Sequence, residues 1–194
     1  MPVVKQVTYY SFDELSEQAQ QKAIETVRQW DDLFHANEEF VLQHFQEQHP
    51  HIHDMDISYS GFCSQGDGAS FTGYINAEWA IDNLLSDELK EIVRDLDCDF
   101  VRTTHHYCHE RTVSTEIEDI TWAYHIEDND NLKDAMLSIH YHTIFNAIEE
   151  YRLNLCHKLY AELEQAYEYC HSDENIKELI LANDYLFDAD GNFQ

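Results

Sequence analysis

The stretch SYSGFCSQGDGASFTGY, residues 58–74, joins two runs in which apolar residues alternate with polar ones. It contains four of the chain's five glycines: Gly61, Gly66, Gly68 and Gly73. Before this stretch, Met55, Ile57 and Tyr59 share one face of an extended chain, and the alternation resumes after it through Phe71, Gly73, Ile75 and Ala77. The sequence predicts a β-hairpin with an unusual connecting loop, since glycine permits a positive φ or a close backbone approach.

Other segments extend this hairpin into a sheet flanked by helices. A second hairpin is expected from residues 99–108 and 112–126, turning around 109–111, and Glu116 and Glu118 would share one face of its second strand. Apolar residues at helical spacing predict helices at about 13–30, 37–48 and 84–96, the last capped by Ser86. A long helix begins at Leu132 and breaks near His171, where Ser172 starts another helix.

The predicted fold class is α+β, with an antiparallel sheet of about four strands packed by a long C-terminal helix and by N-terminal helices. We expect a single domain over residues 1–194, because domains of about 100 to 200 residues are common. The N-terminus has no signal-peptide pattern and no run of about 18 apolar residues occurs, so a cytoplasmic protein without membrane contact is expected. Five cysteines without a C-x-x-C pair indicate reduced thiols.

The charge is strongly one-sided: 39 acidic residues face 11 basic ones, which gives a formal net charge of -28. No lysine or arginine occurs between Arg28 and Lys90, and this stretch contains twelve acids. Four of them begin the stretch: Asp31, Asp32, Glu38 and Glu39. Such a field repels nucleic acid and attracts basic protein surfaces. Selection for solubility alone is the competing explanation.

The glycine-rich loop is the other candidate site. In one interpretation it is only a wide hairpin connection. In the other, the loop contacts a partner or a small ligand, and Phe62 and Phe71 support it. The contacting residues would be Gly61, Phe62, Ser64, Gln65, Gly66, Asp67 and Gly68. It is not a phosphate-binding loop, because the lysine of that motif is absent and Asp67 would oppose an anion.

Thirteen histidines raise the question of a metal site. His49, His51 and His53 alternate, and a second group is crowded at the second hairpin: His105, His106, Cys108 and His109. Neither group has a known ligand spacing, so we expect no metal and no cofactor. No catalytic residue is assigned, because no catalytic motif occurs; the sequence leans against an enzyme.

Three segments resemble a family of small phage and prophage proteins that are sometimes labelled antitoxin-like. They are YYSFDELSEQAQQKAIE at residues 9–25, SGFCSQGDGASFTG at 60–73 and SDENIKELILANDYLFDADGN at 172–192. The resemblance implies a mobile-element origin, residence in a host cytoplasm and no established reaction. In that family we expect a second aromatic residue after Phe62, where this chain has Cys63.

Two functions follow from these observations. In the first, the acidic surface binds a basic surface on a host nucleic-acid-binding protein of defence or regulation, and inhibits it by nucleic-acid mimicry without binding nucleic acid itself. In the second, the loop at 61–73 binds or hydrolyses a small, nucleotide-like ligand. We favour the first, because the stretch without basic residues is unusual. A homodimer through the long helix is an additional expectation.

Overall fold

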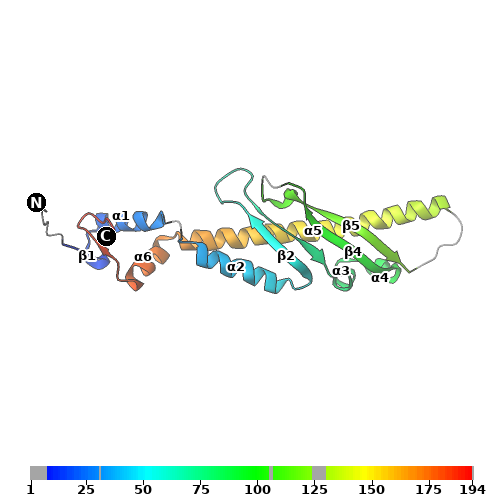
Figure 1. Cartoon of the computed structure of the whole chain (residues 1–194), viewed down its shortest axis with the longest axis horizontal. Coiled ribbons are helices and arrows are strands. Elements are labelled where there is room, and N and C mark those ends of the chain that lie inside the picture. Colours follow the sequence, from blue (N-terminus) through cyan, green and yellow to red (C-terminus); the bar gives the residue numbers. More distant parts are fainter. Residues whose placement is uncertain (1–7, 31, 105–106, 124–129, 194) are drawn as a thin grey trace, which may run out of the picture. The chain divides into compact units, whose positions relative to one another are not determined.

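The structure is a computed structural model that describes residues 8–30, 32–104, 107–123 and 130–193 (Figure 1). Two compact units are present: unit 1 comprises the described residues of Met1–Val41 and Leu163–Gln194, and unit 2 comprises those of Leu42–Glu162. The expectation of one domain over 1–194 stays a prediction.

Unit 2 is built on a four-stranded antiparallel sheet in the order β2-β3-β4-β5, so each strand pairs with the next one along the chain. Its strands are β2 (Ile52–Tyr59), β3 (Ala69–Ile75), β4 (Val93–Arg102) and β5 (Val113–Trp122). The short helices α3 (Ala77–Leu84) and α4 (Asp87–Ile92) join β3 to β4, and the 3-10 helix η2 (Glu110–Thr112) precedes β5. This confirms the predicted hairpins and the α+β class.

The long helix α5 (Asp130–Cys170) covers one face of this sheet. Its buried residues in unit 2 recur at helical spacing, as the apolar pattern predicts: Ile144, Ile148, Leu155 and Leu159. They pack with inward-facing sheet residues such as Phe71 and Phe100, whose rings meet edge to face with centroids 5.5 Å apart. α2 (His35–Gln48) contributes Phe45, which is fully buried beside Phe71.

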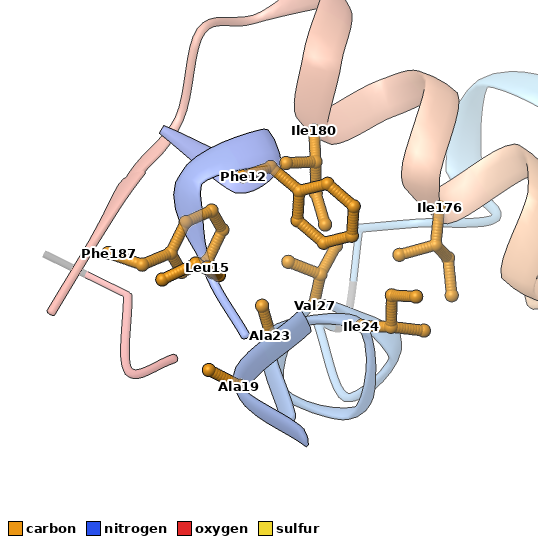
Figure 2. Close-up of a cluster of buried hydrophobic side chains, with 9 residues drawn as sticks. All are labelled: Phe12, Leu15, Ala19, Ala23, Ile24, Val27, Ile176, Ile180 and Phe187. Carbon is orange, nitrogen blue, oxygen red and sulfur yellow. The ribbon is translucent and has the colours of Figure 1, made fainter. Parts of the chain in front are cut away.

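Unit 1 is assembled from the two ends of the chain. The 3-10 helix η1 (Phe12–Glu14), α1 (Glu17–Arg28) and α6 (Asp173–Ala182) enclose one apolar cluster (Figure 2). The strands β1 (Tyr10–Ser11) and β6 (Leu186–Phe187) pair antiparallel beside it. The cluster consists of Phe12, Leu15, Ala19, Ala23, Ile24, Val27, Ile176, Ile180 and Phe187.

Helix boundaries in the structure correct some sequence predictions. The helix expected at 84–96 ends at Ile92, because Val93 and Leu96 belong to β4. α3 was missed: Asn76 accepts a hydrogen bond from the backbone N–H of Trp79 and so caps a helix where alternation predicted strand. The first helix is divided as well, since Ser11 and Glu14 form a capping box on η1, and α1 starts after a second cap at Ser16.

Candidate functional site

The glycine-rich loop between β2 and β3 is closed by its own hydrogen bonds. One carboxylate oxygen of Asp67 accepts from the backbone N–H of Cys63 at 2.9 Å and from that of Ser64 at 2.6 Å. The N–H of Asp67 donates in turn to the carbonyl oxygen of Ser64, and Ser60 and Gly68 bond across the base of the loop. Asp67 therefore has an architectural task within the loop.

Aromatic rings hold the loop against α5. Phe62 lies near Tyr59 and Tyr160, with ring centroids 5.9 and 5.7 Å away, and the hydroxyl of Tyr160 donates to the carbonyl oxygen of Gly61. Phe71 does not join this support, because it is fully buried in the sheet core. Phe62 thus anchors the loop as predicted, with partners that the sequence did not indicate.

The tip of the loop is exposed at Ser64, Gln65 and Gly66. Gly66 has a φ of 102°, and Gly68 is buried so close to His109 that an added Cβ would lie 2.6 Å from the Cβ of His109. These two positions explain why the loop needs glycine. A binding role for this tip stays a prediction.

The acids predicted near the N-terminus lie in the other unit. Asp32 and Glu39 are exposed, and Glu38 is half-buried on the first turn of α2. His35 lies 3.5 Å from a carboxylate oxygen of Glu38 and of Glu39. Asp31 lies outside the described residues. The predicted site residues are therefore divided between two units.

A different acidic group stands out on the face of the sheet that α5 leaves open. Asp97 pairs directly with Asp119 across β4 and β5, and Asp99 pairs with Glu116. We call these four residues the acidic ladder. Three of the four are exposed and Asp99 is half-buried. Directly opposed side chains on paired strands lie about 5 Å apart, so two like-charged pairs are stacked along the sheet.

A β-bulge creates the ladder. The pairing shifts between Asp97 and Cys98, whose partners are Asp119 and Ile117, so Glu118 is the extra residue on β5. Asp119, and not Glu118, therefore lies opposite Asp97, and the expectation that Glu116 and Glu118 share a face stays a prediction. The ladder was missed because its members become neighbours only through the register of two strands.

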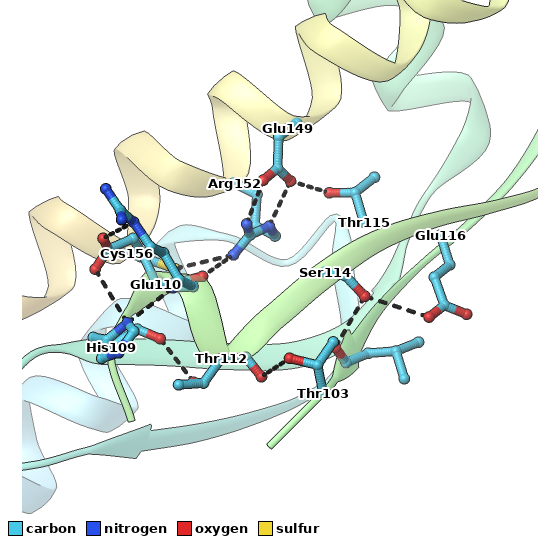
Figure 3. Close-up of polar contacts among 12 residues, drawn as sticks. Thr103, His109, Glu110, Thr112, Ser114, Thr115, Glu116, Glu149, Arg152 and Cys156 are labelled. Carbon is cyan, nitrogen blue, oxygen red and sulfur yellow. Dashed lines mark hydrogen bonds and ion pairs between the residues drawn. The ribbon is translucent and has the colours of Figure 1, made fainter. Parts of the chain in front are cut away.

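A buried ion pair fixes the orientation of β5 beneath the ladder (Figure 3). Arg152 of α5 is only 1% exposed, and it holds both carboxylate oxygens of Glu149 at 2.6 and 2.9 Å. The hydroxyl of Thr115 donates to the same carboxylate at 2.6 Å, and Arg152 also donates to the carbonyl oxygen of Glu110. Because Thr115 points toward α5, its neighbour Glu116 must point to the open face.

The ladder carries uncompensated charge. Among the described residues, no ion pair joins a ladder carboxylate to a basic side chain. Glu116 accepts a hydrogen bond from the hydroxyl of Ser114, which is neutral. Two unit charges 5 Å apart repel by about 0.8 kcal/mol in the dielectric of water, so each pair costs the fold a measurable amount. The open face can therefore attract a cationic surface.

The first histidine group forms part of an aromatic cluster that consists of His49, His51, Trp79 and Tyr151. The ring of His51 stacks on Trp79 with centroids 3.5 Å apart, and its Nε2 lies 2.6 Å from the hydroxyl oxygen of Tyr151. Burial lowers the pKa of His51 to about 4 and raises that of Tyr151 to about 12. Across the described part of the chain, no three His, Cys, Asp or Glu side chains could hold a metal ion; His105 and His106 lie outside it.

The fold and these features define a class: an α+β protein whose antiparallel sheet is covered by a long helix on one face and acidic on the other. The chain belongs to the family described as Domain of unknown function (DUF8835), whose model matches residues 42–173. The match begins at the first residue of unit 2 and covers all of that unit. No curated protein and no solved structure matches the chain.

No helix that the structure describes is both long enough and apolar enough to cross a bilayer.

Proposed function

We propose that this protein is an acidic interaction protein whose acidic ladder binds a basic surface on a nucleic-acid-binding protein and competes there with nucleic acid. The observation that carries the proposal is the pairing of Asp97 with Asp119 and of Asp99 with Glu116 on an open sheet face. Like charges in direct opposition destabilise a sheet. Their presence without a cation is understandable if a partner supplies the cations.

The net charge supports the same proposal. A formal charge of -28 steers basic partners toward the protein and keeps it away from nucleic acid itself. A surface of the partner that binds nucleic acid carries positive charge. Nucleic acid and this acidic protein would therefore bind the same basic residues of the partner. That the partner belongs to a host cell, in defence or regulation, rests on the resemblance to phage and prophage proteins.

Small-ligand binding at the glycine-rich loop has less support. The carboxylate of Asp67, its strongest polar group, already accepts two hydrogen bonds from loop N–H groups. The two cavities described in the structure are lined by residues of other segments. The ladder is therefore the site on which the proposal rests.

The test uses two variants with the same change in charge. Asp97→Lys with Asp99→Lys reverses half of the ladder, and Glu38→Lys with Glu39→Lys makes an equal change in unit 1. Tagged wild-type protein is first used to capture partners from nuclease-treated bacterial lysate at low salt, and the bound proteins are identified by mass spectrometry. The association rate of each purified partner with the three proteins is then measured.

We expect a partner that also binds nucleic acid, is released by high salt and is displaced by duplex DNA. The ladder variant should associate with it at least tenfold more slowly, while the unit 1 variant changes the rate by less than threefold. Equal effects of the two variants would show that only net charge matters. A partner that DNA does not displace would refute mimicry.

A further inference from the structure

Strand β5 forms one border of the sheet. The order β2-β3-β4-β5 leaves its second edge without a neighbouring strand among the described residues. The backbone N–H and C=O groups along such an edge can pair with another extended chain. β5 also carries two of the four ladder residues, Glu116 and Asp119. The open edge and the acidic face therefore meet on one strand.

A groove runs beside this edge. It is a cavity of about 380 Å³ between β5 and α5. Apolar residues from both elements belong to its lining, among them Ile117, Ile120, Leu137 and Tyr141, and so do two acidic residues of β5, Glu118 and Asp119. Among the residues that the structure describes, no lysine or arginine belongs to this lining. The groove can thus accept apolar side chains under a negative rim.

We infer that β5 is a docking strand to which an extended basic segment of the partner protein adds as a fifth strand. This inference rests on the proposed function and specifies the form in which the basic partner is recognised. Main-chain hydrogen bonds along an edge supply affinity in this mode of binding, and pockets for alternate side chains supply specificity.

The two faces of the sheet determine the composition of the bound segment. Side chains of an added strand alternate between the faces. Those on the α5 side would enter the groove near Ile120 and Tyr141, where apolar residues fit. Those on the open side would lie beside Glu116 and Asp119, where lysine or arginine fits. The expected segment therefore alternates basic and apolar residues over about the length of β5.

A second copy of this chain does not suit the same edge. Pairing β5 with itself would bring Glu116, Glu118 and Asp119 of one copy close to the same three carboxylates of the other. β5 contains no lysine or arginine that could compensate them. Charge thus selects a basic partner over a homodimer at this edge.

The test uses three fluorescent heptapeptides that have the same charge and the same set of side chains. One alternates lysine and valine, the second has the same sequence with alternate backbone nitrogens methylated, and the third has its lysines and valines in separate blocks. Binding to the full chain is measured by fluorescence anisotropy at about 0.1 M salt. The bound peptide is located by NMR measurement of hydrogen exchange at the backbone amides of the protein.

The alternating peptide should bind at least tenfold more tightly than the other two and slow the exchange of amides within residues 113–122. Equal binding of all three peptides would overturn the inference, because it would reflect charge attraction alone. Slowed exchange confined to α5 would also overturn it, since the groove would then hold a peptide that does not pair with β5.

Two variants complete the test. Tyr141→Ala removes a groove side chain that is 37% exposed, so the fold should tolerate it, and binding of the alternating peptide should weaken about fivefold. Tyr169→Ala, an exposed residue of α5 in unit 1, serves as the control and should have no effect. If peptide pairing fails while the ladder variant still loses its salt-sensitive partner, the docking strand is wrong and the proposed function stands; failure of both experiments refutes both.

Discussion

Acid should destabilise unit 2 through His51, and the size of the effect follows from its surroundings. The ring is stacked on Trp79 and bonded to Tyr151, and burial lowers its pKa from 6.5 to about 4. The neighbouring His49 and His53 contribute to this shift, and burial together with Lys158 of α5 lowers the pKa of His49. His49 also has a buried Nε2 atom with no hydrogen-bond partner among the described residues. Burial and the two neighbouring histidines therefore oppose the protonation of His51.

The sign of the effect follows from linkage. A histidine whose pKa is depressed by folding contributes its full stability above pH 6.5 and loses it as the pH falls toward 4, because the unfolded chain binds the proton first. At pH 5 the unfolded state gains about 2 kcal/mol by this route. His51 is only half-buried, so solvent screening reduces the expected value to about 1 kcal/mol.

The variant His51→Gln removes the titratable imidazole and keeps a polar group facing Tyr151. The free energy of unfolding is measured by urea titration at pH 7.5, 6.5, 5.5 and 5.0 for the wild type, for this variant and for His157→Gln, an exposed control on α5. Carboxylate titration is common to all three proteins and cancels. The wild type and the control should lose about 1 kcal/mol more than His51→Gln between pH 7.5 and 5. Parallel curves would show that His51 has the same pKa in the folded and unfolded states.

Three other outcomes are expected. Glu149→Gln should lower the free energy of unfolding by about 3 kcal/mol in a urea titration, because it leaves the buried Arg152 charge without its partner. The control Glu150→Gln, at an exposed position, should lower it by under 0.5 kcal/mol. Similar losses in the two variants would contradict a buried ion pair. Asp67→Ala should cost about 1 kcal/mol and speed hydrogen exchange in the loop at 60–68, and an unchanged exchange rate would show that its two hydrogen bonds do not order the loop. In the native protein, the exposed Cys63 should react with a thiol reagent within minutes. Burial raises the pKa of the Cys98 thiol to about 12 and that of Cys156 to about 11, so these two should react only on unfolding. Fast labelling of those two would contradict their burial.

Local patterns predicted the elements whose signals lie within a few residues. The alternation around Ile57 and Phe71 gave the first hairpin, and Ser172 marked the end of α5 and the start of α6 because its hydroxyl accepts from the N–H of Asn175. Val93 was assigned to a helix because apolar residues at 89, 92, 93 and 96 fit a helical stripe. Pairing with β5 overrides that local preference.

The candidate site depended on information that no local pattern contains. The ladder needs the register of β4 against β5 and the bulge at Glu118, and both are set by packing rather than by spacing along one strand. The loop was recognised because glycine leaves a signal in the sequence itself. The role of Asp67 within that loop requires the positions of the N–H groups of Cys63 and Ser64.

The division of unit 1 between the chain ends has a consequence during synthesis on the ribosome. Unit 2 is continuous in sequence, so all of its residues, 42–162, have been made before the second half of unit 1 exists. α1 is translated early, yet its buried residues Ala23 and Val27 have no apolar partners from α6 until residues 173–182 emerge. Domains generally fold as they are made. A nascent chain should therefore expose the apolar stripe of α1 until residues 173–182 have emerged from the ribosome, and this is the interval in which a chaperone would bind it.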